Sequence, residues 1–111
     1  MGIRVAIASS DNIVVNQHFG HTQHFYIYEV YGEKEYHYIE DREVKPPCSF
    51  GEHDQNMLEE AVRSIHDCQY ILCTRIGGGA RFLLSEFGIQ SYEIGDYIED
   101  SLKRIWNLNQ L

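Results

Sequence analysis

Residues 3–8 read Ile-Arg-Val-Ala-Ile-Ala, and turn-forming Ser, Ser, Asp and Asn follow at 9–12. A mostly apolar run that stops at a cluster of turn-forming residues is typical of a β-strand that ends in a polar loop. The sequence therefore predicts a first strand over residues 3–8. It also predicts a loop over residues 9–24, at the carboxyl end of that strand.

Apolar and aromatic runs predict four more strands, at residues 25–31, 36–44, 70–73 and 89–94. The run at 25–31 is apolar on both faces apart from Glu29, as expected of an interior strand. The run at 36–44 carries many charged residues, which favours an exposed edge.

Three helices are expected between and after these strands. Asp54 can cap the first helix, whose apolar residues follow the i, i+3, i+4, i+7 spacing. The second helix ends at Gly88, a residue type favoured just beyond a helix C-terminus. Asp96 and Glu99 resemble a capping box that opens the third helix.

The element order β-β-β-α-β-α-β-α predicts an α/β fold with a five-stranded mixed sheet. Two hairpins join the first three strands, and right-handed helical crossovers make the fourth and fifth strands parallel to the first. The strand order is then 3-2-1-4-5, with strand 2 antiparallel and helices on both faces. Loops 9–24, 45–53 and 74–79 would lie along one edge of this sheet, where open α/β proteins bind ligands.

Length, charge and cysteine content narrow the class of protein. The 111 residues are expected to form one domain, residues 1–111, and the formal net charge is −8. Without clustered cations, neither nucleic acid nor a membrane surface is an expected partner. The sequence has no apolar run long enough to span a bilayer and no signal-peptide pattern. Three cysteines without a C-x-x-C motif do not make a disulfide framework, so we expect a cytoplasmic protein.

His18, His21 and His24 are the first candidate metal ligands. Imidazole binds transition metals readily, and Gly20 lets the backbone turn two rings toward one ion. The alternative is that these histidines are hydrogen-bonded to backbone or water. Such pairs are common, and no carboxylate follows at the spacing of zinc proteases.

Cys48 and His53 are the second candidate set. Cys48 follows two prolines in a loop, and an accessible thiolate is a soft ligand for iron or an iron–sulfur cluster. An ordinary turn with a half-buried thiol is the alternative. Cys68, at a helix end, and Cys73, in an apolar strand, are expected to be packing residues.

Gly77, Gly78 and Gly79 precede the second helix and are flanked by Arg75 and Arg81. Free N–H groups at a helix N-terminus and nearby guanidinium groups favour binding of an anion. The glycines match neither a phosphate-binding P-loop nor a complete dinucleotide fingerprint. The alternative is a tight strand-to-helix turn that needs glycine for a positive φ.

Five short motifs stand out: Val15-Asn16-Gln17-His18-Phe19-Gly20-His21, Pro47-Cys48, Asp67-Cys68, Arg75-Ile76-Gly77 and Gly88-Ile89. Together they resemble the dinitrogenase iron–molybdenum cofactor biosynthesis family, as in NifX-type carriers and the C-terminal domain of NifB. The resemblance covers about the whole chain and implies a ribonuclease-H-like three-layer fold. It places the family's motif histidines at His18 and His21 and its cysteine-bearing loop at Cys48. The family's usual Asp-Gly turn after the first strand is Asp11-Asn12 here.

The resemblance also implies a function in nitrogen fixation. It implies a non-catalytic carrier or accessory domain that binds an iron–sulfur or iron–molybdenum cluster precursor, with nitrogenase cofactor-assembly proteins as partners. One alternative is a metal-dependent hydrolase on the same fold, which needs clustered carboxylates where the first strand offers only Asp11 near its end. A second alternative is an interaction or regulatory module that docks on a cofactor-biosynthesis enzyme.

Overall fold

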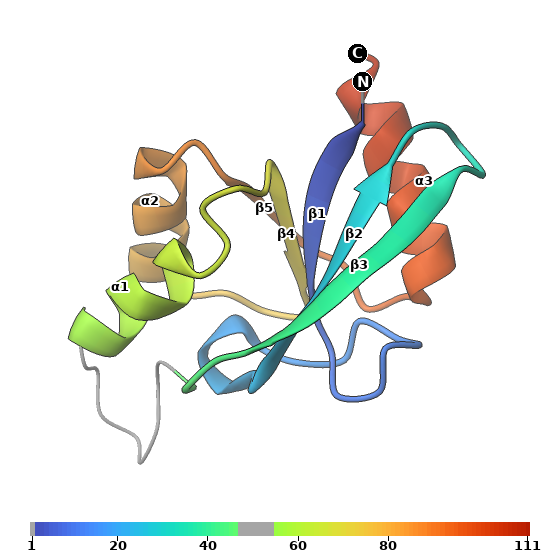
Figure 1. Ribbon diagram of the computed structural model, residues 1–111. Coiled ribbons are helices and arrows are strands. Elements are labelled where there is room, and N and C mark those ends of the chain that lie inside the picture. The colour runs from blue at the N-terminus through green and yellow to red at the C-terminus, as the bar shows by residue number, and fades with distance from the viewer. Residues whose placement is uncertain (1, 47–54) are drawn as a thin grey trace.

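The computed structural model describes residues 2–46 and 55–111 as a sheet with helices on both faces (Figure 1). The strands are β1 (Ile3–Ala8), β2 (His24–Val30), β3 (Tyr36–Glu43), β4 (Tyr70–Cys73) and β5 (Gln90–Glu93). The helices are α1 (Gln55–Arg63), α2 (Gly78–Glu86) and α3 (Ile98–Asn109), and a short 3-10 turn, η1, spans Phe19–His21.

The strand order is β3-β2-β1-β4-β5, so the predicted topology is confirmed. β1 pairs with β2 antiparallel and with β4 parallel. β2 pairs with β3 antiparallel, and β4 pairs with β5 parallel. β3 is an edge strand with mostly exposed side chains, as its charged residues predicted, and β2 is interior.

Two hydrophobic cores hold the three layers together. Side chains of successive residues in a strand point to opposite faces, so β1 contributes to both cores. Ala6 and Ala8 pack under α1 and α2, whereas Val5 and Ile7 pack under α3. All four are fully buried, which explains why this strand has almost no polar residues.

The observed helix ends agree only in part with those predicted from the sequence. Gly88 follows α2 with φ +76°, as predicted for a residue beyond a helix C-terminus. The predicted capping box of α3 is wrong, because Tyr97 occupies the N-cap position and no side chain caps the helix. The Ile98 N–H donates to the carbonyl of Ile13 at 2.8 Å, so a neighbouring loop supplies the acceptor that Asp96 was expected to supply.

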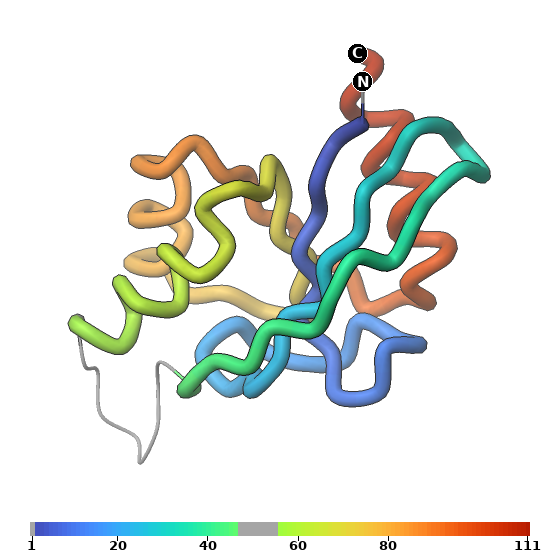
Figure 2. The backbone as a smooth tube through the Cα atoms, viewed as in Figure 1, coloured from blue at the N-terminus to red at the C-terminus, as the bar shows by residue number. Residues whose placement is uncertain are grey.

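Loop 9–24, the end of β3 and the segment after β4 lie at one edge of the sheet. This edge is at the bottom of Figure 1, and the tube in Figure 2 shows the same arrangement. We call it the loop edge. Val44, just past β3, donates its N–H to Gln23 O at 2.9 Å, which brings the end of β3 to the start of β2. Within the described residues, no helix is both long and apolar enough to cross a membrane.

Candidate functional site

The start of loop 9–24 is held by a compact set of hydrogen bonds. The buried Ser9 hydroxyl donates to Val14 O at 2.6 Å, and Asp11 Oδ1 accepts the N–H groups of Ile13 and Val14 at 2.9 and 3.1 Å. These backbone donors hold the pKa of Asp11 below its usual range. Asn12 adopts φ 59°, a left-handed conformation that asparagine tolerates. Asp11 therefore serves to form the turn.

The next part of the loop pairs with the ends of two strands. Gln17 donates its N–H to Ala8 O at 3.3 Å and accepts the N–H of Thr74 at 3.0 Å. Phe19 donates its N–H to Arg75 O at 2.9 Å. Open α/β proteins usually bind ligands between the carboxyl ends of two such strands, but here the chain's own backbone fills that crevice. A ligand at this edge therefore meets the outer surface of the loop.

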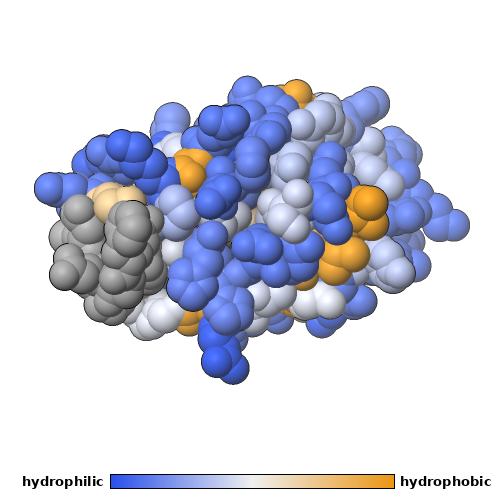
Figure 3. All heavy atoms as spheres, turned by 90° about the horizontal axis from the view of Figure 1, so that it is seen from below, coloured by the Kyte–Doolittle hydropathy of each residue, from blue (hydrophilic) through white to orange (hydrophobic). Residues whose placement is uncertain are grey.

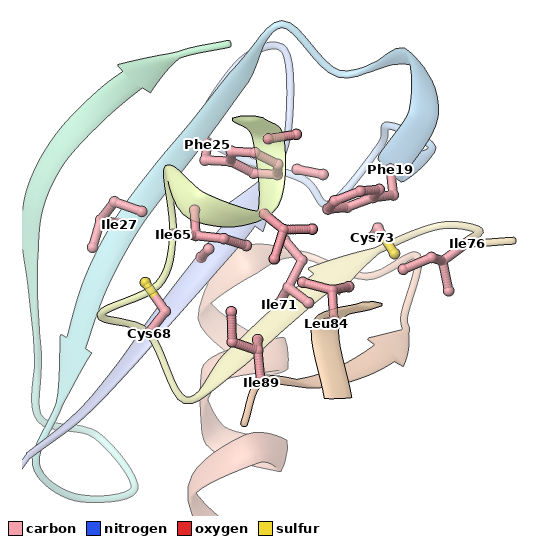
Figure 4. Packing of buried hydrophobic residues seen from close by; sticks show 14 residues of the cluster. Phe19, Phe25, Ile27, Ile65, Cys68, Ile71, Cys73, Ile76, Leu84 and Ile89 are labelled. Carbon is pink, nitrogen blue, oxygen red and sulfur yellow. The ribbon is translucent and has the colours of Figure 1, made fainter. Parts of the chain in front are cut away.

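η1 presents two imidazoles on this surface. Phe19 is 1% exposed, and its ring lies 5.8 Å from that of Phe25. Figure 4 shows Phe19 pointing into the cluster of buried side chains, beside Cys73. His18 and His21 are both exposed, and their rings stack with centroids 5.5 Å apart and 22° between their planes. The structure thus brings together the two histidines that were singled out in the sequence.

The other predicted metal ligands are placed differently. His24 begins β2, where its Nδ1 lies 2.9 and 3.1 Å from the two carboxylate oxygens of Asp41. Among residues 2–46 and 55–111, no three His, Cys, Asp or Glu side chains gather closely enough to hold a metal ion. His24 therefore does not complete a three-ligand group with His18 and His21. Cys48 and His53 lie outside the described residues, so their role stays a prediction.

Gly77 is the N-cap of α2, and Gly78 and Gly79 are the first two residues of the helix. Backbone geometry does not require glycine at these three positions. Gly77 has φ −76°, and Gly88 is the glycine with positive φ in the described part of the chain. A Cβ atom added at Gly77, Gly78 or Gly79 would meet no atom within 4 Å. The alternative that glycine is needed here for a positive φ is therefore wrong. What the glycines do is leave the N-terminus of α2 uncovered.

The charges beside this helix start are mixed. Glu93 accepts the N–H of Ile76 at 3.0 Å and lies 3.7 Å from the Arg81 guanidinium, so Arg81 is partly neutralised. Arg75 is exposed and forms no ion pair with any described residue. Its backbone is fixed to Phe19, next to His18. Of the two arginines, Arg75 is the one whose charge remains available beside the histidines.

The two described cysteines are packing residues, as predicted. Cys68 and Cys73 are both buried and form no disulfide. Burial raises the pKa of each thiol to about 12. A thiol with such a pKa is almost entirely protonated at neutral pH, so neither can act as a ready ligand or nucleophile.

Sequence reasoning missed the residues that hold the histidine turn in place. Gln17 and Thr74 act through backbone hydrogen bonds, which leave no signature in residue type. Phe19 stands in the recognised motif, and its buried ring suggests why an aromatic residue is needed between the histidines. The Thr74 hydroxyl, close to this contact, is a buried oxygen without a hydrogen-bond partner in the described structure.

Comparison with known proteins identifies the family. The family model described as dinitrogenase iron-molybdenum cofactor matches residues 1–108. FeMo cofactor biosynthesis protein NifB of Frankia alni is 37% identical over 106 residues, which cover 93% of this chain and 21% of that protein. Protein NifY of Klebsiella pneumoniae is 36% identical over 75 residues, which cover 68% of this chain and 31% of that protein. The chain thus spans about a fifth of the length of the NifB protein that it matches.

Solved structures share the fold. The crystal structure of PH0822 matches with a TM-score of 0.69 and 23% identity, over 95% of this chain and 90% of that one. The NMR structure of a Thermotoga protein matches with a TM-score of 0.60 and 20% identity, over 93% of this chain and 86% of that one. The sequence match over residues 1–108 and the identity to NifB establish that the chain belongs to the dinitrogenase iron–molybdenum cofactor family.

Proposed function

We propose that this chain binds an iron–sulfur or iron–molybdenum cluster precursor at the loop edge and passes it on during assembly of the nitrogenase cofactor. The observation that carries the proposal is the stacked, exposed pair of His18 and His21 on a turn anchored in the core. The names of the relatives, FeMo cofactor biosynthesis protein NifB and Protein NifY, support the same function. Residues 1–111 would act as one accessory domain, with cofactor-assembly proteins as partners.

The ligands at the loop edge suit reversible binding of a cluster. Neutral imidazole is a good ligand for iron, and two exposed rings can approach a cluster from one side. A resident iron–sulfur cluster is usually held by four protein ligands, so two imidazoles would leave it exchangeable. Arg75 and the uncovered N-terminus of α2 favour a cluster with net negative charge. Cys48 would add a thiolate to this set.

A non-catalytic role is part of the proposal. Metal-dependent hydrolysis of phosphate esters needs several carboxylates around two metal ions. Asp11 is the carboxylate nearest the end of β1, and its Oδ1 already accepts two backbone N–H groups. This use of Asp11 favours a carrier over a hydrolase.

Anaerobic titration of the metal-free protein tests the proposal. The probes are an iron–sulfur cluster assembled from ferrous iron and sulfide, and isolated iron–molybdenum cofactor. We expect an absorbance change and co-elution of iron with the wild-type protein, both lost in the His18→Ala/His21→Ala variant. His37→Ala, which removes an exposed histidine from β3, is the matched control and should bind like wild type. Absence of iron from the wild-type fraction, or equal iron in the double variant, would contradict the proposal.

A further inference from the structure

A groove opens on the α3 side of the sheet, between the β2–β3 hairpin and the start of α3. It consists of two hollows of about 460 and 580 Å³ that share Tyr36, Glu99 and Asp100 as lining residues. We call it the tyrosine groove, and its main lining residues are Ile13, Tyr28, Tyr36, Tyr97, Glu99 and Asp100. None of these residues is a candidate cluster ligand, so the proposed binding of a cluster does not account for the groove.

Aromatic rings extend from the groove along the sheet. The Tyr28 ring lies 6.0 Å from that of Tyr36 and 5.5 Å from that of Tyr38. Tyr26 continues the row at 6.4 Å from Tyr38, whose side chain is 48% exposed. Tyr28 is 7% exposed and belongs to the core, Tyr26 and Tyr36 are half-buried, and Tyr38 is the exposed ring of the row. Because the buried ring supports the others, a ligand can contact their exposed parts with little loss of conformational freedom.

Two large apolar side chains stand at the mouth of the groove on rigid backbone. Ile13 is 59% exposed and Tyr97 is 60% exposed. Ile98 donates its N–H to Ile13 O at 2.8 Å, and Val14 forms a β-bridge with Tyr97, which fixes the two side by side. Figure 3 views the loop edge, where hydrophilic atoms predominate and the apolar areas are small and separate, one of them on the right. Exposed apolar side chains that lie next to one another, as Ile13 and Tyr97 do, mark interaction surfaces more often than single scattered ones do.

The charged residues that line the groove are mostly acidic: Glu33, Glu99 and Asp100, against Lys34 and Lys103. Glu33 pairs with Lys103 at 3.5 Å, whereas Glu99 and Asp100 form no ion pair with a described residue. Acidic residues in the first turn of a helix interact favourably with its dipole, so these two alone would not indicate a partner. The faces of the aromatic rings beside Glu99 and Asp100 also carry negative electrostatic potential. Burial first, and then the Asp41 carboxylate, raise the pKa of both Tyr26 and Tyr38.

We propose that the tyrosine groove docks a basic segment of a partner protein that also carries apolar side chains. Lysine or arginine would lie over the tyrosine faces, where cation–π attraction adds to the attraction of Glu99 and Asp100. Apolar side chains of the segment would cover Ile13 and Tyr97. The excess of acidic over basic residues in the lining disfavours nucleic acid and favours a cationic protein segment. This docking surface goes beyond the proposed binding of a cluster and does not depend on it.

The test uses short synthetic peptides and backbone amide NMR of the full chain. A peptide that alternates arginine and leucine should shift the signals of Ile13, Tyr36 and Tyr97. Ile13→Ser/Tyr97→Ser should weaken its binding roughly tenfold, and Glu99→Gln/Asp100→Asn roughly fivefold. Phe82→Ser removes an apolar residue that is 65% exposed on α2 and should leave the binding unchanged. All variants change surface residues and should keep the thermal midpoint within about 5 °C of wild type, with the largest decrease in Glu99→Gln/Asp100→Asn, which removes two charges that favour the α3 dipole.

Three results would overturn the proposal. The first is the absence of shifts at the groove with the basic peptide. The second is equal binding of a peptide with glutamate in place of arginine. The third is a wild-type dimer in sedimentation that Ile13→Ser/Tyr97→Ser converts to a monomer, because a second copy would then cover the groove.

Discussion

The imidazole rings of His18 and His21 stack at 5.5 Å across a turn whose middle side chain, Phe19, is buried in the core. The turn therefore holds two exposed imidazoles, while the buried Phe19 ring fixes its position. In the proposed role, binding and folding would be carried by different side chains of residues 18–21. Substitutions at these residues can separate the two properties.

Removal of both imidazoles should leave the fold intact. His18 and His21 are exposed, and surface substitutions usually change the free energy of unfolding by no more than about 0.5 kcal/mol. We expect His18→Ala/His21→Ala to keep the thermal midpoint within about 3 °C of wild type. Differential scanning calorimetry checks this. A much larger drop would mean that the histidines hold the turn together, and the ligand role would lose its support.

Phe19→Ala, in contrast, should strongly lower the free energy of unfolding. Truncation of a buried phenylalanine costs about 3–5 kcal/mol, because apolar contacts are lost and a cavity remains. Phe82→Ala is the matched control, since Phe82 is 65% exposed and should cost about 0.5 kcal/mol or less. Urea denaturation of the two variants measures the difference. Similar stability of both would show that Phe19 does not anchor η1.

The ionisation of Asp67 should make the free energy of unfolding depend on pH in the acidic range. Its two carboxylate oxygens accept from Arg42 at 2.7 and 2.8 Å, and Arg42 holds the pKa of Asp67 well below its usual range. Because the folded pKa is below the unfolded value of about 3.9, this stabilisation is present above about pH 4 and is lost as the pH falls further. Asp67→Asn should cost about 1–3 kcal/mol at neutral pH.

The pH profile separates this ion pair from general acid unfolding. Between pH 6 and pH 3, the wild-type free energy of unfolding should fall more steeply than that of Asp67→Asn, which lacks the titrating group. Urea denaturation at several pH values gives both curves. Asp67 also pairs with Arg4 at 2.8 Å, so parallel curves would show that its ion pairs with Arg42 and Arg4 together contribute little to stability.

Substitution of alanine for glycine should change the stability in opposite directions at two positions. Gly88 has φ +76°, where a Cβ atom is disfavoured, so Gly88→Ala should cost about 1–2 kcal/mol. Gly79 lies in the first turn of α2 without an atom near its added Cβ, so Gly79→Ala should stabilise the protein by up to about 1 kcal/mol. Thermal denaturation compares them. Loss of cluster retention in the stabilised Gly79→Ala variant would then report contact with the cargo.

The three cysteines should differ in reactivity. Burial raises the pKa of Cys68 and Cys73 to about 12, so both should react slowly with iodoacetamide until the protein unfolds. Cys48 should be labelled first and be protected by bound cluster. Cys73→Ala should mainly cost stability, by about 1 kcal/mol or more. Labelling followed by peptide mass mapping checks the order, and Cys73 reacting first would contradict it.

The strands and the topology could be predicted because their signals are local. β1 is apolar apart from Arg4 and β4 is an apolar run, and their observed bounds match the predicted residues 3–8 and 70–73. The hairpins and the handedness of the crossovers then leave few possible strand orders. The start of α3 was missed because a hydrogen bond to Ile13, distant in sequence, replaces the expected cap.

The candidate site could be predicted only in part for the same reason. His18 and His21 are close in sequence, so their proximity follows from a short turn. The pairing of Gln17 with Thr74 and of Phe19 with Arg75 uses backbone atoms of two loops, which residue types do not reveal. His24 was grouped with the other histidines by spacing, but its place in β2 puts it next to Asp41.

Pulsed electron paramagnetic resonance tests the central claim most directly. The protein would be labelled with nitrogen-15 at histidine and loaded with a paramagnetic cluster, either reduced iron–sulfur cluster or isolated iron–molybdenum cofactor. The proposal predicts hyperfine coupling between the cluster spin and histidine nitrogen, retained in His37→Ala and absent in His18→Ala/His21→Ala. The same coupling in the double variant, or its absence from loaded wild-type protein, would contradict the assignment of the two histidines as cluster ligands.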